Sequence, residues 1–274
     1  MQNHAVRSQV LNTRTLALLL GGVIIVLTLV TPMDVFGMGS MFTVHMAQHL
    51  LLSLGGPPLL ILGIPAWSCR HFLSRHPLIA RGLALLTIPF VASILFNGNL
   101  WIWHAPPIFQ AMMLNTGLHI FANLLYIVTG LLFWWPLLNP LQEEKPTLSL
   151  GGKLAYLFFS DMPMMLLGAG LTFTPPLYSF PMSNMQMSVT AMDQQLGGLL
   201  MWVVGSIFFI VLASIFFLRW MLRQEKTQQE KELAQDEDAW EQDDDDPEQD
   251  DEELERQRIA RVSDRASKDS FVER

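Results

Sequence analysis

Residues 42–65 read FTVHMAQHLLLSLGGPPLLILGIP and contain no Lys, Arg, Asp or Glu. A helix of this length crosses the roughly 30 Å hydrocarbon core of a bilayer. About half of all residues are hydrophobic, at 51%, which excludes an ordinary soluble domain. The predicted fold class is an all-α integral membrane protein, a bundle of about six transmembrane helices at Thr15–Met33, Phe42–Pro65, Gly82–Trp103, Leu118–Leu138, Leu154–Thr174 and Met192–Trp220.

The basic residues indicate how these helices are oriented. Between Met1 and Gln224, Lys and Arg occur only at the N-terminus, in alternate gaps, or after the last run, at Arg7, Arg14, Arg70, Arg75, Arg81, Lys145, Lys153, Arg219 and Arg223. Basic residues mark the cytoplasmic side. We therefore expect both termini in the cytoplasm and the protein in the cytoplasmic membrane. The three gaps without basic residues then lie outside, at Asp34–Met41, His104–Gly117 and Pro175–Ala191.

Charge also divides the chain into two predicted domains. Residues 1–224 hold nine basic and five acidic residues, a net of +4, and form the membrane domain. Residues 225–274 hold eight basic and twenty acidic residues, a net of −12, and form an acidic cytoplasmic tail. We expect Glu225–Leu233 to extend the last helix briefly and Asp236–Glu255 to be disordered, because dense charge prevents a packed core. No nucleic-acid partner is expected.

Several local features refine the bundle. Gly55-Gly56-Pro57-Pro58 at the middle of the second run predicts a kink or break, which lipid tolerates only if neighbours or water bind the freed carbonyls. Gly168-Ala169-Gly170 and Gly197-Gly198 predict close helix packing. The first run lacks a convincing cleavage site, which favours a retained helix over a cleaved signal. Cys69, the single cysteine, excludes an internal disulfide and a Cys-x-x-Cys metal site.

His45-Met46-Ala47-Gln48-His49 is the sharpest local motif. On a helix, His45 and His49 share one face about 6 Å apart, and Met41 lies one turn earlier on the same stripe. Imidazole and thioether ligands suit Cu(I). The spacing alone is a weak signal, but polar residues inside a membrane are more often functional.

Other soft ligands gather on the same predicted side. His104 ends the third run and His119 begins the fourth, and both face uncharged gaps. Each could equally be an interfacial histidine bound to backbone or headgroups. Ten of the sixteen methionines also lie in outer gaps or at outer helix ends, at Met33, Met38, Met41, Met46, Met112, Met113, Met182, Met185, Met187 and Met192. The alternative is that methionine serves as a flexible apolar filler.

Two carboxylates lie within or at the edge of the predicted spans. Asp193 opens the last helix, where it suits the positive helix end as an N-cap, and it is also a candidate outer-face metal ligand. Asp161 lies within the fifth helix and is expected to be partnered or protonated.

Five stretches carry a resemblance to a known family: HMAQHLLLSLGGPPLLILGIP, WIWHAPP, LHIFANLLYIVTGLLFWWPLL, LTFTPPLYSF and MDQQLGGLLMWVVG. Over residues 41–223 and in this order, the chain resembles the multi-span CtaG family of cytochrome c oxidase assembly factors, which differs from the single-span copper chaperone of the same name. The resemblance implies a non-enzymatic cytoplasmic-membrane protein that helps haem–copper oxidase mature at a copper step. The family's recurring histidines correspond here to His45, His49, His104 and His119, and its aspartate to Asp193.

Two departures from that family matter. Asn123 stands where members often have a second histidine, four residues after the position of His119, and asparagine is a poor copper ligand. Many members also have an extra N-terminal span. The resemblance implies oxidase subunits, and extracytoplasmic copper chaperones, as partners within the lipid bilayer. Two other functions stay open: a transporter for copper or a small solute, and a haem-binding redox protein. Histidines four residues apart on one helix cannot hold opposite faces of one haem, which disfavours the latter.

Overall fold

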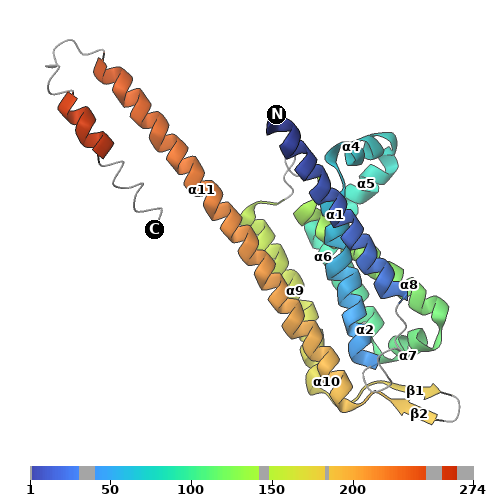
Figure 1. The fold of residues 1–274 in the computed structure, drawn as a ribbon. Helices are drawn as coiled ribbons and strands as arrows, with labels where there is room; N and C mark the ends of the chain where they lie inside the picture. The colour runs from blue at the N-terminus through green and yellow to red at the C-terminus, as the bar shows by residue number, and fades with distance from the viewer. Residues whose placement is uncertain (1, 31–40, 142–147, 183–184, 245–254, 264–274) are drawn as a thin grey trace. The chain divides into compact units, whose positions relative to one another are not determined.

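The fold is a helical bundle with one short β-hairpin (Figure 1). The computed structural model describes residues 2–30, 41–141, 148–182, 185–244 and 255–263. The chain divides into two compact units, Met1–Phe217 and Leu218–Arg274. The elements are α1 (Gln2–Val30), α2 (Met41–Leu50), the π-helical turn η2 (Leu51–Gly55), α3 (Gly56–Gly63), α4 (Ala66–Arg75), α5 (Pro77–Leu86), α6 (Pro89–His104), α7 (Pro106–Leu114), α8 (Thr116–Leu138), α9 (Leu150–Phe173), β1 (Ser179–Met182), β2 (Met185–Ser188), α10 (Ala191–Leu199), the π-helical turn η3 (Leu200–Val204) and α11 (Gly205–Asp244).

Five helical stretches of the described chain are long and apolar enough to cross a membrane: Thr13–Val30, Phe42–Gly63, Thr116–Leu138, Leu150–Phe173 and Ala191–Gln235. A sixth crossing results if α5 and α6 are counted as one bent span. This agrees with the prediction of about six spanning helices. The cytoplasmic placement of both termini stays a prediction.

The third predicted span is not one straight helix. Helices α5 and α6 meet at 76°, so the expected continuous run Gly82–Trp103 is wrong in its first part. The break falls at Thr87 and Ile88, immediately before Pro89. A residue that precedes proline is disfavoured in the α conformation, and Ile88 accordingly has a ψ of 127°. The helix is therefore interrupted only at Thr87 and Ile88. Helix α6 then begins with proline at its first position, where the missing N–H costs no helical hydrogen bond.

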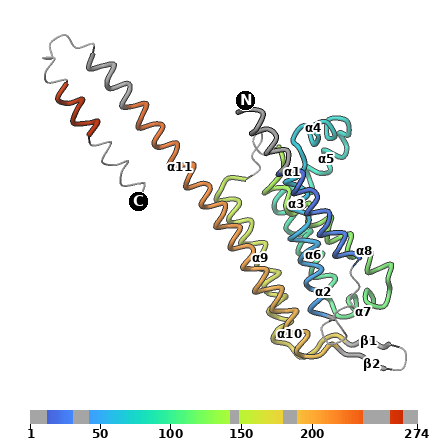
Figure 2. Tube along the Cα trace, viewed as in Figure 1, coloured from blue at the N-terminus to red at the C-terminus, as the bar shows by residue number. Residues whose placement is uncertain are grey.

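The second span confirms the predicted interruption and shows how it is accommodated. Helices α2 and α3 follow each other along this span (Figure 2). Between them the backbone forms the π-helical turn η2, and Pro57 and Pro58 occupy the first turn of α3. The Ser53 carbonyl would bond to Pro57 in an α-helix or to Pro58 in a π-helix, and neither proline has an N–H. The Trp134 indole of α8 donates to that carbonyl at 2.9 Å. Gly130 allows this approach, since a Cβ there would lie 2.9 Å from the same oxygen.

Glycines bring α9 and α10 into backbone contact. A Cβ at Gly198 would lie 2.7 Å from the carbonyl oxygen of Gly168, and a Cβ at Gly168 would lie 2.9 Å from Trp202. The predicted close packing is confirmed at these two positions. Gly170 has open space beside it within the described chain, so it takes no part in the contact.

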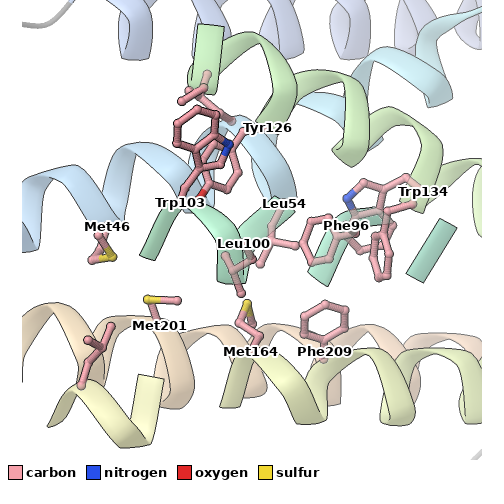
Figure 3. Close-up of a cluster of buried hydrophobic side chains, with 14 of the residues drawn as sticks. Met46, Leu54, Phe96, Leu100, Trp103, Tyr126, Trp134, Met164, Met201 and Phe209 are labelled. Carbon is pink, nitrogen blue, oxygen red and sulfur yellow. The ribbon is translucent and has the colours of Figure 1, made fainter. Parts of the chain in front are cut away.

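An aromatic core joins α6, α8 and α11 at the centre of the bundle (Figure 3). Phe96 stacks on Phe133 at 4.4 Å between ring centroids, and Trp134 stacks on Phe209 at 6.3 Å. The Tyr156 hydroxyl donates to the Phe133 carbonyl at 2.8 Å and adds α9 to the same core. Packing of this kind holds α6 and α8 side by side, and these two helices carry His104 and His119.

The C-terminal helix runs further than expected. Helix α11 continues to Asp244 rather than ending near Leu233, and residues 255–263 form another helical segment. The predicted disorder of the acidic tail stays a prediction. Residues 225–235 are rich in Glu, Gln and Lys, which are strong helix formers, and Gln228 donates to Glu232 one turn later at 3.1 Å. Local propensity therefore supports α11 as far as residue 235, whereas residues 236–244 are mostly Asp and Glu.

Candidate metal centre

Two helices bring three histidines together at one end of the bundle. His45 and His49 lie one turn apart on α2, and His119 lies in the first turn of α8. One ligand nitrogen from each of the three lies within 4.8 Å of the others. The ring centroid of His45 is 4.0 Å from that of His49 and 5.5 Å from that of His119. We call these three residues the histidine cluster.

The cluster is buried, yet its nitrogens lack protein partners. His45 is fully buried, His49 is 3% exposed, and His119 is half-buried. Both ring nitrogens of His45 and His49, and Nε2 of His119, have no hydrogen-bond partner in the described part of the chain. We call these the five cluster nitrogens. Buried polar atoms are normally paired, and each neutral imidazole has one nitrogen lone pair that can bind a metal. The donor set therefore fits a metal that accepts imidazole ligands.

His104 lies beside the cluster and is held separately. It is the last residue of α6, and its ring centroid is 6.1 Å from that of His49. Its Nδ1 is 2.7 Å from the Leu100 carbonyl oxygen, and its Nε2 is 3.2 Å from the Met46 sulfur. The Tyr178 hydroxyl donates to the His104 carbonyl at 2.9 Å. Burial raises the pKa of Tyr178, so this hydroxyl keeps its proton and remains a donor.

Asp193 caps a helix other than its own. Its two carboxylate oxygens accept hydrogen bonds from the backbone N–H groups of Phe42 and Thr43, at 2.8 and 3.0 Å, and the Thr43 hydroxyl donates to it at 2.7 Å. The Thr190 hydroxyl caps α10 instead, by accepting from the Asp193 N–H. The prediction that Asp193 caps its own helix is therefore wrong: its carboxylate caps α2, one turn before His45. The three-histidine group does not include Asp193, which remains a candidate ligand from sequence alone.

The methionines expected to join the site have different outcomes. The side chains of Met41, Met182, Met185 and Met187 lie outside the described part of the structure, as do residues Met33 and Met38. The backbone of Met182 pairs with Met185 in the β1–β2 hairpin. Met46 is fully buried and contacts His104. The sequence placed Met46 on the outer side but did not single it out as a ligand, because it lies off the His45/His49 stripe.

Helix α8 adds two polar groups that sequence reasoning undervalued. The ring of Tyr126 lies 3.9 Å from that of His49, and its buried hydroxyl has no hydrogen-bond partner among the described residues. The amide oxygen of Asn123 is also buried and has no hydrogen-bond partner among the described residues. His119, Asn123 and Tyr126 occur at i, i+4 and i+7, which places them on one face of α8. That spacing is the signal that could have identified Tyr126.

Asp161 belongs to a different polar region of the bundle. It is partly buried in α9, and neither its Oδ1 atom nor the Ser206 hydroxyl of α11 has a hydrogen-bond partner in the described ranges. The adjacent Ser160 bonds to Ser93 of α6 at 2.8 Å, and its carbonyl accepts from Asn97 at 3.2 Å. The expectation that Asp161 is partnered or protonated stays a prediction, and Asp161 lies outside the metal-ligand group.

Comparisons with known proteins place the chain in a family. The chain is 26% identical over 242 residues to an uncharacterized protein of Mycobacterium bovis, covering 80% of this chain and 35% of that protein. It is 29% identical over 166 residues to an uncharacterized protein of Mycobacterium leprae, covering 55% of this chain and 24% of the other. The chain thus spans about a third or less of these relatives. No solved structure matches it. The family model described as Cytochrome c oxidase caa3 assembly factor, Caa3_CtaG, matches residues 2–223, and the chain therefore belongs to this family of assembly factors.

Proposed function

We propose that this protein binds Cu(I) as cargo at the histidine cluster and assists the metallation of a cytochrome c oxidase subunit. The family indicates a role in cytochrome c oxidase assembly. The observation that supports the metal step is the group of five buried cluster nitrogens, for which the described chain supplies no partner. Leaving such atoms unpaired is costly, and a bound metal would satisfy one nitrogen of each of the three imidazoles.

The chemistry of the donors favours Cu(I) over harder cations. The cluster offers three imidazoles, and a thioether lies next to the adjoining His104. Imidazole and thioether suit Cu(I), whereas Mg²⁺ and Ca²⁺ need oxygen ligands. Zinc accepts imidazole, but the carboxylate of Asp193, which lies on α10 against the start of α2, already receives three hydrogen bonds from protein groups.

A haem site fits the same residues poorly. His45 lies edge-on to Phe109 at 5.2 Å, and His49 lies against Tyr126 at 3.9 Å. A haem lies across the nitrogen end of an axial imidazole, and two histidines four residues apart on one helix cannot occupy opposite axial sites of one haem. An optical spectrum of the purified protein without a haem absorption band is the expected result. A haem band would favour the redox alternative.

The protein–copper interaction is tested by titrating Cu(I), without oxygen, against a chromophoric Cu(I) chelator. The comparison is between the wild type, His45→Ala/His49→Ala, and the matched control His71→Ala/His76→Ala, which removes two exposed histidines from the α4–α5 region. We expect tight binding by the wild type and the control, and loss of that binding in the cluster variant. Equal binding by all three proteins would overturn the proposal.

The location of the site on the extracytoplasmic side rests on the basic residues and is part of the proposal. Cysteines introduced at Ser183 and Ser149 should label from opposite sides of intact membranes. The native Cys69 is buried, and burial raises the pKa of its thiol, so it reacts slowly; Cys69→Ser provides a clean background. Labelling of both introduced cysteines from one side would contradict this orientation.

A further inference from the structure

We infer that His104 and Met46 form a second copper position beside the histidine cluster. This inference rests on the proposed function, since it concerns the same cargo. It differs from the ligand set expected from sequence, in which Met41 supplies the sulfur. The sulfur that the folded chain brings to a histidine is that of Met46, at 3.2 Å from Nε2 of His104.

The hydrogen positions around His104 leave two lone pairs facing each other, which a cation can bind. Nδ1 is 2.7 Å from the Leu100 carbonyl oxygen, which can only accept, so Nδ1 carries the hydrogen. In the neutral imidazole Nε2 then has a lone pair and no hydrogen. It points at the Met46 sulfur, which also has no hydrogen to donate. Two lone pairs at 3.2 Å are stabilised only when a positive charge binds both atoms.

The alternative, a buried imidazolium, is costly at this position. His104 is 3% exposed and Met46 is fully buried. An ionised group in an apolar interior is costly without a counter-ion, and no acidic side chain of the described chain forms an ion pair or hydrogen bond with His104 in this structure. A soft monovalent ion instead uses both lone pairs directly, and it brings its own ligand preference for nitrogen and sulfur.

The pair is also built into position by its surroundings. The Leu100 carbonyl fixes the His104 ring, and the Tyr178 hydroxyl binds the His104 backbone. Gly197 of α10 makes room for the thioether, since a Cβ there would lie 3.1 Å from Cγ of Met46. A methionine acting only as core filler would not require its sulfur to meet an oriented imidazole nitrogen.

The geometry of the pair favours exchange over permanent storage. Bonds from a first-row metal to sulfur and imidazole nitrogen are about 2.3 and 2.0 Å, so atoms 3.2 Å apart bind one ion from the same side. The opposite side of the ion stays open to another ligand. The His49 ring, with its centroid 6.1 Å from that of His104, is the adjoining member of the cluster. The two positions can therefore pass Cu(I) between them.

X-ray absorption of the full-length protein, loaded with Cu(I) without oxygen, tests this inference without any activity measurement. For the wild type at two equivalents we expect nitrogen scattering and a sulfur shell at about 2.3 Å. Met46→Leu should lose the sulfur shell and one of two bound equivalents. Met164→Leu is the matched control, because Met164 is another buried methionine, on α9 against Gly205, and both sulfurs are visible in Figure 3. The control should keep the shell.

Each remaining outcome decides one of the two proposals. A nitrogen-only spectrum of copper-loaded wild type, or a sulfur shell that survives in Met46→Leu, would overturn the second position and leave the histidine cluster intact. Absence of copper binding by the wild type would overturn the proposed function itself. Should Met46→Leu fail to fold, Met46→Cys keeps a sulfur donor at this position, and His104→Gln removes the nitrogen partner. The first should retain sulfur scattering and the second should lose it.

Discussion

Two parts of the second span treat buried polar atoms in opposite ways. At η2 the prolines free the Ser53 carbonyl, and the Trp134 indole binds it at 2.9 Å. One to two turns earlier, at His45 and His49, the described chain supplies no donor or acceptor for the four ring nitrogens. Both regions are buried in the same bundle. The difference shows that this chain can satisfy buried polar atoms in the same span, and the unpaired cluster nitrogens are what the proposed copper binding explains.

The largest expected effect comes from replacing His45 and His49, whose ring nitrogens have no partner in the described chain. In cells at limiting copper, His45→Ala/His49→Ala should lower oxidase copper content and oxidase activity severely, while the protein stays in the membrane at its normal level. Its Cu(I) affinity should fall by more than about 100-fold, since loss of two ligands exceeds typical effects of outer-shell partners. Copper content is measured on purified oxidase.

Added copper should restore part of the activity if the defect lies in affinity. Normal oxidase copper content in the double variant at limiting copper would eliminate the metal-transfer mechanism, and the family membership would then support a scaffolding role only.

The second-largest effect is expected from removing the hydrogen bond between Trp134 and the Ser53 carbonyl. Trp134→Phe keeps an aromatic ring in the core but leaves the Ser53 carbonyl without its donor. The free energy of unfolding in mixed detergent micelles should fall by about 1–3 kcal/mol, the cost of one unpaired buried polar group. Trp67→Phe, at a side chain that is 70% exposed, should change it by less than about 0.5 kcal/mol. Equal changes in the two variants would contradict this account of η2.

A smaller effect separates capping from metal binding at Asp193. Asp193→Asn keeps one oxygen but turns an amide N–H₂ towards the N–H groups of Phe42 and Thr43. As for the loss of a helix cap, the free energy of unfolding should fall by about 0.5–2 kcal/mol. Cu(I) affinity, measured by chelator competition, should fall by less than about tenfold, because the carboxylate acts on α2 and not on the ion. A loss of affinity as large as that of the double histidine variant would make Asp193 a ligand.

The smallest effect is expected at Asn123. Its amide oxygen has no partner among the described residues, and asparagine is a poor copper ligand. Asn123→Ala should change Cu(I) affinity by less than about tenfold and the free energy of unfolding by less than about 0.5 kcal/mol. Asn123→His offers a further imidazole one turn after His119 and should tighten binding. Weaker binding in that variant would show that the face of α8 is not directed into the cluster.

Much of the bundle was predictable because membrane helices obey local rules. The apolar runs matched the observed spans, and the Gly–Pro interruption of the second run was recognised. The bend before Pro89 was missed, since a run that is apolar on both sides of a break has a continuous hydropathy signal. The extension of α11 to Asp244 was not predictable, because residues 236–244 are mostly Asp and Glu, a composition typical of disordered segments.

The sequence by itself determined that His45 and His49 share a face of one helix, because a period of 3.6 residues is a property of the backbone alone. It also determined that His104 and His119 lie at ends of apolar runs. Only the tertiary structure decided that His119 joins the α2 pair, that Met46 rather than another methionine faces His104, and that Asp193 caps α2. The physical reason is that contacts between helices depend on which faces pack together. Packing depends on close helix contacts at glycines and on aromatic side chains from several helices. These contacts follow no regular spacing along the sequence.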